Sequence, residues 1–254
     1  MRVFLIIVAL LITLPTQAND KELAKIFNGI NGTIIIRSLN TNKQYSYNDK
    51  RAKQRFTIAS TFKIFNTLIA LQENAIKPNE ILKWDGTVHP EFPAWDQDQT
   101  LESAFKLSCV WCYQELAKRI GDTHYQKYLT NAHYGVLHQP FNTTTFWLDG
   151  SLKISAIEQI EFLKKVYLKT LLFSAENYDI LKQIMIAKQT PSFTLRAKTG
   201  WAARATPQIG WYVGYVETSN DIWFFATNID IQQESDLVLR QQLTEAALHA
   251  KHII

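Results

Sequence analysis

The chain has 254 residues, of which 46% are apolar and 20% are charged, and its formal net charge is +4. This apolar share excludes an intrinsically disordered chain, two cysteines exclude a disulfide-stapled miniprotein, and nine glycines exclude a collagen-like repeat. The basic residues form no clustered stripe, which argues against a nucleic-acid partner, and the length suits one large domain with a substantial core.

The first 18 residues have the pattern of a secretory signal peptide. Arg2 gives a positive start, Val3 to Leu14 is almost wholly apolar, and small residues precede a polar one at the end of the segment. A membrane anchor is the alternative, but a spanning helix needs about 20 apolar residues. We therefore expect cleavage after Ala18, export to the periplasm, and a catalytic domain over 19–254 that has no membrane contact.

Strand patterns occur near both ends of the chain. A β-branched run predicts a strand over 33–38, and alternation predicts its hairpin partner over 44–47. Late in the chain, strands are predicted over 193–198, 210–217 and 222–229. A polar turn joins the last two, and strands joined by short turns are antiparallel. Both ends of the chain are therefore expected to build one antiparallel sheet.

Helical patterns fill most of the remaining sequence. Apolar residues recur at helical spacing over 21–27, 60–73, 101–120, 123–131, 155–167, 178–187 and 235–251. No linker rich in Pro, Gly or Ser divides the chain. The fold class expected is therefore α/β, of the α+β type. A central antiparallel sheet from both chain ends is flanked by helices, and a mostly helical region is inserted between its halves.

Several catalytic and metal-binding signatures are absent. The sequence has no phosphate-binding glycine loop and no zinc-protease motif, so we expect no metal. Cys109 and Cys112 form a Cys-x-x-Cys pattern. A redox site of that kind normally begins a helix, whereas here both residues lie inside the helical pattern of 101–120. We favour two buried packing thiols, with a local disulfide as the alternative.

A Ser-x-x-Lys pattern occurs twice, at Ser60–Lys63 and at Ser103–Lys106. Residues three apart share one face of a helix, so each lysine amine lies where it can act as a base for the serine hydroxyl. The pattern is short enough to arise by chance in a chain of this length. The surroundings of each serine must therefore decide between the two.

The surroundings favour Ser60. It begins a helix that is apolar on nearly every side, and such a helix is buried. Free backbone N–H groups and the helix dipole at that position stabilise an oxyanion. Burial disfavours the ammonium form of Lys63 and leaves a neutral, reactive amine. Ser103 and Lys106 instead begin a half-polar helix, where the lysine reaches solvent.

Two short motifs follow downstream, in the order Ser108-Cys109-Val110 and then Lys198-Thr199-Gly200. Alone, each is typical of an ordinary helix hydroxyl or strand end. With Ser60-Thr61-Phe62-Lys63 they form an ordered set that resembles the penicillin-recognising serine enzymes. Phe-Trp-Leu-Asp-Gly at 146–150 and Gly-Trp-Tyr-Val-Gly at 210–214 make the chain similar to the class D β-lactamases, the oxacillinases.

The resemblance covers nearly all of residues 19–254. It implies a β-lactamase/transpeptidase-like fold and hydrolysis of β-lactam antibiotics through a serine acyl-enzyme, with resistance as the consequence. Two alternatives share the acylation chemistry but not the turnover: a penicillin-binding sensor domain, and a peptidoglycan transpeptidase or carboxypeptidase. The resemblance leaves both monomer and homodimer open, and it implies no cofactor other than CO2 or bicarbonate.

The resemblance also implies a role for each catalytic residue. Ser60 is the acylated nucleophile, and Lys63 is the general base in both acylation and deacylation, as the carbamate N6-carboxylysine. Trp147 holds that carbamate through its indole N–H, and Val110 keeps its pocket dry. Ser108 relays a proton to the leaving ring nitrogen.

The substrate-binding residues implied by the same resemblance are Lys198, Thr199, Gly200, Trp201 and Arg240. Among these, Lys198, Thr199 and Arg240 bind the substrate carboxylate. The backbone N–H groups of Ser60 and Trp201 form the oxyanion hole. Val136 stands where the family usually has an asparagine, and a valine side chain offers no hydrogen bond, so we assign it no role.

Overall fold

A six-stranded antiparallel sheet forms the centre of the computed structural model, which describes residues 20–254. The predicted signal peptide, 1–18, lies outside the described residues. The strand order is β2-β1-β11-β10-β9-β8. The strands are β1 (Gly32–Ser38), β2 (Gln44–Tyr47), β8 (Ile186–Gln189), β9 (Phe193–Ala202), β10 (Gln208–Thr218) and β11 (Ile222–Ile231). The two ends of the chain meet where β1 pairs with β11, which confirms the predicted architecture.

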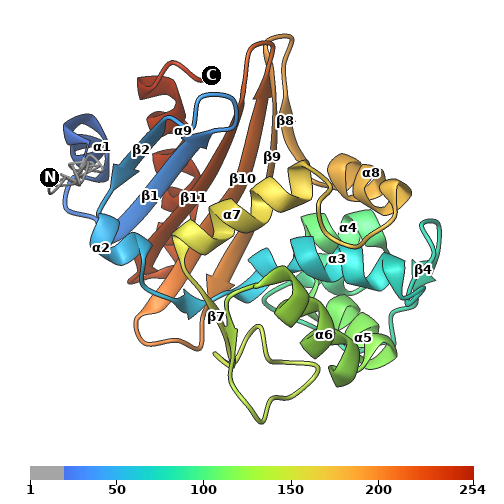
Figure 1. The fold of residues 1–254 in the computed structure, drawn as a ribbon. Helices are drawn as coiled ribbons and strands as arrows, with labels where there is room; N and C mark the ends of the chain where they lie inside the picture. The colour runs from blue at the N-terminus through green and yellow to red at the C-terminus, as the bar shows by residue number, and fades with distance from the viewer. Residues whose placement is uncertain (1–19) are drawn as a thin grey trace, which may run out of the picture.

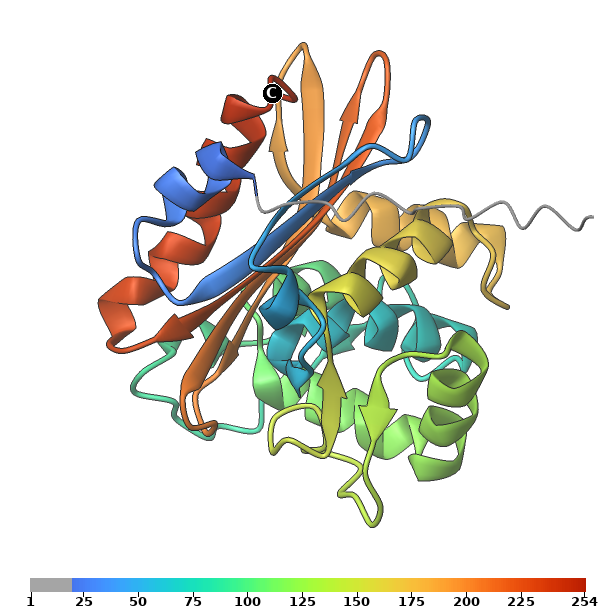
Figure 2. The same ribbon diagram turned by 60° about the vertical axis from the view of Figure 1, so that its left-hand side comes forward.

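Helices cover both faces of the sheet (Figure 1). α1 (Lys21–Phe27) and α9 (Leu239–Ala250) pack on one face, where they bury a small core that includes Leu23, Phe225 and Leu248. α7 (Ala156–Tyr167) and the inserted helical region cover the opposite face, as the turned view in Figure 2 shows. Among residues 20–254, no helix combines the length and apolar character needed to cross a membrane.

The inserted region surrounds one buried helix, α3 (Lys63–Gln72), in which every residue from Lys63 to Leu71 is buried. Aromatic rings, including Phe62, Phe65 and Tyr134, pack around its start. The other helices are α2 (Asp49–Ala52), α4 (Leu101–Lys106), α5 (Val110–Ile120), α6 (Asp122–Ala132) and α8 (Ala175–Ile184). Short strands complete the fold: β3 (Phe56–Thr57), β4 (Ile81–Leu82), β5 (Gln99–Thr100), β6 (Val136–Leu137) and β7 (Leu152–Ile154). The burial predicted for the helix of Ser60 and Lys63 is thus confirmed.

The prediction of one helix over 101–120 is wrong, because a short turn interrupts the helix between α4 and α5. Ser108 lies in the break with a φ of 56°, a left-handed conformation that no helix interior accommodates. Apolar residues keep helical spacing across the break, so the sequence pattern conceals it. The preference for free thiols is wrong for the same reason. The Cys-x-x-Cys begins α5 after all, and Cys109 and Cys112 form a disulfide across a Cα–Cα distance of 5.5 Å.

Several element boundaries also differ from the prediction. The helix expected from Ser60 is a 3-10 turn up to Phe62 and α-helical from Lys63, and the helix expected over 235–251 is α9, which begins at Leu239 after a 3-10 helix, Glu234–Val238. The helix expected over 178–187 is α8, which begins earlier and ends at Ile184, and Ile186 already belongs to β8. The strand expected to end at Lys198 continues to Ala202, since the whole length of β9 pairs with β10. The Lys-Thr-Gly motif therefore lies inside a strand of the main sheet rather than at its end.

A buried ion pair ties α2 to the main sheet ahead of β3. Arg51 Nη2 lies 2.7 Å from Asp230 Oδ1, and the two side chains are only 7% and 8% exposed. Arg51 Nε also donates to Asn228 Oδ1 at 2.8 Å. Removing one partner of such a pair leaves an uncompensated charge at a buried position. This cluster holds the segment that leads into the turn of Ser60.

We predict that Asp230→Asn destabilises the fold by about 3 kcal/mol, since it leaves the Arg51 charge unpaired. Asp179→Asn is the matched control, because Asp179 pairs with Lys169 on the surface, where the side chains are 64% and 42% exposed. It should cost under about 1 kcal/mol. The free energy of unfolding, measured in urea at neutral pH, checks both values. Equal losses in the two variants would contradict the structural role of the buried pair.

Candidate active site

Ser60 lies in a 3-10 turn, Ala59–Phe62, that joins β3 to α3. Ala59 has a φ of 51°, and its N–H donates to the carbonyl of Trp147 at 2.9 Å. The hydroxyl of Thr61 donates to the Ile58 carbonyl at 2.8 Å. The Thr61 bond closes the turn on itself, and the Ala59 bond holds it against the 146–152 segment, so the position of Ser60 depends on a loop that is distant in sequence.

Lys63 reaches back to Ser60 on the same helical face. Its Nζ donates to Ser60 Oγ at 3.2 Å, and the lysine is only 1% exposed. Burial lowers the pKa of Lys63 to about 7. The Nζ also lies 4.7 Å from the ring centroid of Tyr113. A large fraction of Lys63 is therefore a neutral amine at neutral pH, as the sequence predicts, and a neutral amine is able to accept the proton of Ser60.

Trp147 contributes a buried donor that has no acceptor. The residue is 1% exposed, its ring stacks on Phe62 at a centroid distance of 5.9 Å, and its indole Nε1 makes no hydrogen bond to any described residue. An unsatisfied buried N–H costs about 1–3 kcal/mol. Such a donor next to the Ser60 turn fits an additional acceptor group on Lys63, which is what a carbamate would supply.

Ser108 and Lys198 meet across the site. The Nζ of Lys198 donates to Ser108 Oγ and, at 3.0 Å, to the carbonyl of Thr199. Lys198 is 3% exposed. Burial, with the neighbouring charges of Lys63 and Arg240, holds the pKa of Lys198 well below its usual range. The left-handed backbone of Ser108 thus presents its hydroxyl to an amine that is readily deprotonated.

Strand β9 passes close to the Ser60 turn because Gly200 has no side chain. A Cβ at this position would lie 3.0 Å from Thr61 Cγ2 and 3.2 Å from the carbonyl oxygen of Ile58. Arg240, from the start of α9, donates from Nη1 to the Gly200 carbonyl at 2.8 Å. Burial lowers the pKa of Arg240 to about 10, so its guanidinium stays charged at neutral pH.

These groups surround a cleft of about 500 Å³. The predicted residues that line it are Ser60, Ser108, Val110, Thr199, Gly200, Trp201 and Arg240. Lys63, Trp147 and Lys198 are buried and do not line the cleft, although Lys63 and Lys198 hydrogen-bond to serines that do. The structure therefore brings the predicted residues together, and their catalytic roles stay predictions.

Several lining residues were not predicted from the sequence, among them Phe92, Trp95, Leu148 and Leu237. Phe92 and Trp95 lie in the irregular segment between β4 and β5, which has no helical or strand periodicity to single them out. The only signal there is the density of aromatic residues beside Pro90 and Pro93.

The second Ser-x-x-Lys pattern has a structural role. Ser103 forms a capping box with Thr100 at the start of α4. Lys106 pairs with Glu102 one turn away, and the two side chains are 49% and 56% exposed. This confirms the surface position predicted for Lys106, which lies at the rim of the cleft.

Comparison with known proteins places the chain in a family. The penicillin-binding-protein transpeptidase domain matches residues 27–249. The β-lactamase OXA-48 of Klebsiella pneumoniae is 38% identical over 98% of this chain and 96% of its own length. The β-lactamase OXA-2 of Salmonella typhimurium is 42% identical over 79% of this chain and 72% of its own.

Solved structures agree. The class D β-lactamase YbXI from Nostoc superposes with a TM-score of 0.89 at 44% identity, over 91% of this chain and 99% of that protein. The class D β-lactamase FUS-1 (OXA-85) from Fusobacterium nucleatum subsp. polymorphum gives a TM-score of 0.90 at 36% identity, over 93% and 100% of the two chains. Together with the Ser60–Lys63 pair at the cleft, these similarities show that the chain belongs to the class D β-lactamases, which are hydrolases.

Proposed function

We propose that the cleft hydrolyses β-lactam antibiotics through an acyl-enzyme on Ser60, and that this activity confers resistance. The observation that carries the proposal is the 3.2 Å contact between Ser60 Oγ and the buried Nζ of Lys63. A nucleophile with a base within hydrogen-bond reach is the minimum that acyl transfer requires. The relatives of this chain that are named β-lactamases support the choice of substrate.

Acylation and hydrolysis then follow from the positions of the side chains. Lys63 accepts the hydroxyl proton as Ser60 Oγ bonds to the lactam carbonyl carbon, and the N–H groups of Ser60 and Trp201 stabilise the oxyanion. The carbonyl–nitrogen bond of the ring breaks as Ser108 delivers its hydroxyl proton to that nitrogen, and Ser108 is reprotonated with the proton that Lys63 took from Ser60, which leaves Lys63 a free base again. Water next attacks the ester as Lys63 accepts its proton, and Lys63 then passes this proton to Ser60 Oγ as the ester bond breaks, which restores the free serine.

We infer that Lys63 works as a carbamate. Addition of CO2 to its neutral Nζ forms an N–C bond and releases one proton, and the buried lysine supplies that neutral amine. When present, the carbamate provides an anionic general base. The unpaired indole N–H of Trp147 would donate to it, and Val110, which lines the cleft, would limit the access of water.

The Arg240 side of the cleft fits the carboxylate of a β-lactam. Arg240 and Thr199 line the cleft, and Lys198 Nζ donates to the Thr199 hydroxyl at 3.2 Å from behind it. Arg240 supplies the positive charge for the carboxylate, and the amine of Lys198 supplies a further N–H donor. Arginine pairs with carboxylates through two parallel hydrogen bonds.

We also propose that the protein acts after export to the periplasm, where β-lactams reach it before they reach the cell-wall enzymes.

Sustained turnover tests the proposed function. We expect steady hydrolysis of a chromogenic cephalosporin, whereas a protein that only acylates would release one equivalent and stop. Ser60→Ala should lower kcat by roughly 10⁴-fold or more. Ser103→Ala is the matched control, and it should retain most activity because the Ser103 hydroxyl caps α4 and bonds to Gln99 but does not line the cleft. A single stoichiometric burst from the unmodified enzyme would contradict the proposal.

Lys63 gives the activity a defined pH dependence. Because burial places its pKa at about 7, protonation as the pH falls through 7 removes both the free amine and its capacity to hold CO2. We expect kcat to fall below pH 7 in degassed buffer and to recover when bicarbonate is added at fixed pH. Steady-state rates with and without bicarbonate measure this.

Carbon-13 NMR identifies the modified residue directly. After equilibration with labelled bicarbonate, the enzyme should show one carbamate signal that is absent from Lys63→Ala. Trp147→Phe keeps the aromatic packing but removes the indole donor, so it should weaken the signal and slow deacylation more than acylation. An active enzyme that lacks the signal and ignores bicarbonate would leave Lys63 as a plain amine base.

Arg240→Ala should lower kcat/KM for penicillins by about 10- to 100-fold, the usual range for a hydrogen bond to a charged group. The same variant should match the unmodified enzyme on a penicillin methyl ester, which has no carboxylate. Parallel rates on the acid and its ester measure the difference. An equal loss on both would show that Arg240 acts through the Gly200 carbonyl and not through the substrate.

A further inference from the structure

Trp95 bridges the two sides of the turn that carries Ser108. Its indole Nε1 donates to the carbonyl of Leu107 at 3.0 Å, so it fixes the peptide that precedes Ser108. Its own backbone carbonyl accepts from the indole Nε1 of Trp111, in the first turn of α5, at 3.0 Å. Trp95, in the segment between β4 and β5, is therefore hydrogen-bonded to residues on both sides of Ser108.

Ser108 needs such a constraint. Its φ of 56° is unfavourable for a residue with a side chain, by roughly 1–2 kcal/mol, and persists only where the surroundings over-determine it. The Cys109–Cys112 disulfide fixes the α5 side, and the Cys109 N–H ties the turn back to α4 by donating to the Ala104 carbonyl at 2.9 Å. On the α4 side, the Leu107 N–H donates to the Ser103 carbonyl at 2.9 Å, while the side chain is 38% exposed. The bond from Trp95 holds the other polar backbone group of Leu107, its carbonyl, which belongs to the peptide joined to Ser108.

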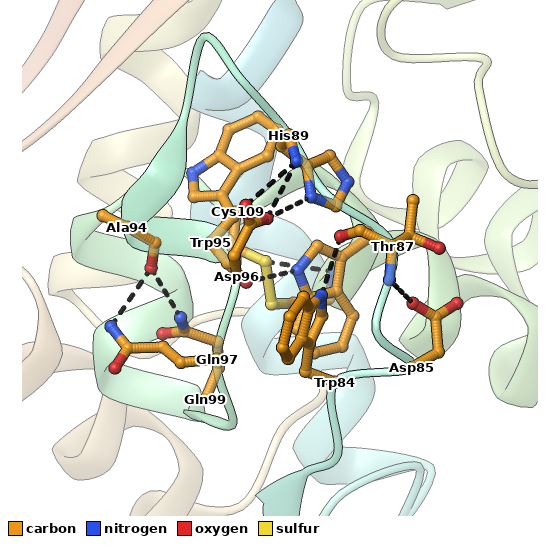
Figure 3. A network of polar contacts seen from close by, with 12 residues as sticks. Trp84, Asp85, Thr87, His89, Ala94, Trp95, Asp96, Gln97, Gln99 and Cys109 are labelled. Carbon is orange, nitrogen blue, oxygen red and sulfur yellow. Dashed lines mark hydrogen bonds and ion pairs between the residues drawn. A yellow bond between two sulfur atoms is a disulfide. The ribbon is translucent and has the colours of Figure 1, made fainter.

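Trp95 is itself held by its own segment, and Figure 3 shows the polar contacts of the residues on either side of it, Ala94 and Asp96. It is 8% exposed, and the ring of Phe92 stacks on it at a centroid distance of 4.3 Å. The next residue, Asp96, accepts from the backbone N–H of His89 at 3.0 Å and lies 2.7 Å from its ring nitrogen. Gln99 Nε2 donates to the Ala94 carbonyl, on the other side, at 2.9 Å. The segment between β4 and β5 therefore sets the orientation of the Trp95 indole N–H, independently of the Ser108 turn.

We propose that Trp95 is a positioning residue for proton transfer at Ser108. By holding the Leu107 carbonyl it fixes the backbone of Ser108, and so keeps Ser108 Oγ against Lys198 Nζ. The inference rests on the proposed role of Ser108 in returning a proton to the lactam nitrogen. The ring of Trp95 also lines the cleft, so the test must separate the N–H from the aromatic surface.

Trp95→Phe makes that separation, since it removes the donor and keeps an aromatic ring at the wall. We expect kcat for a cephalosporin to fall about tenfold, the rate equivalent of one hydrogen bond, with KM changed less than threefold. Trp84→Phe is the matched control. Trp84 belongs to the same segment, but its indole donates to the Thr87 carbonyl at 2.8 Å, away from the Ser108 turn. Its kcat should stay within twofold of the unmodified enzyme.

A double-mutant cycle with Ser108→Ala tests whether the loss of kcat in Trp95→Phe arises through Ser108. If Trp95 acts through Ser108, Trp95→Phe causes no further loss in the Ser108→Ala background. Multiplicative losses, or a Trp95→Phe enzyme with full kcat, would overturn the inference while leaving the role of Ser108 intact. Activity that survives Ser108→Ala unchanged would instead refute that role. Should Trp95→Phe not fold, Trp95→Leu takes its place in the same cycle, since it removes the same donor and keeps an apolar side chain at the wall.

Discussion

The desolvation of one lysine is the constraint on which this structure depends. Water must be kept from Lys63 for its amine to be neutral at neutral pH, and nearly everything around α3 serves that exclusion. The ring of Tyr113 lies over Lys63 Nζ, and Phe62, the residue before Lys63, is fully buried in the same core. A buried, unpaired lysine opposes folding, so the large aromatic core offsets a cost that catalysis imposes. The apolar surroundings of α3 therefore keep the amine of Lys63 neutral as well as stabilise the fold.

The remaining groups come from positions far apart in the sequence. Ser60 lies in the 3-10 turn that leads directly into Lys63 at the start of α3, whereas Ser108 stands in an irregular turn and Lys198 lies within the main sheet. The close approach of β9 to the Ser60 turn is possible because Gly200 leaves space for Thr61. The cleft is thus a junction between a strand of the sheet and two turns of the helical region, each fixed by its own backbone hydrogen bonds.

The sequence was informative wherever function depends on local spacing. Ser-x-x-Lys at the start of an apolar helix predicts both the contact and the burial of Lys63, and alternating residues predict the long strands. It was uninformative where tertiary contacts override periodicity. The turn at Ser108 interrupts an unbroken apolar pattern, so the turn was not predicted and the disulfide was only the alternative to two free thiols. Trp95 lies in a segment without periodicity, and the two-residue strands such as β3 exist only through distant partners.

The pairing of β1 with β11 sets the order in which a newly made chain is able to fold. Until residues 222–231 have been synthesised, β1 has only the short hairpin strand β2 beside it, and Arg240 is not yet present. Sheet closure and completion of the cleft therefore wait for the last few dozen residues. Pairing over such a long sequence separation is slow. A chain that ends before residue 222 consequently lacks both the strand that joins β1 to the rest of the sheet and the arginine that lines the cleft.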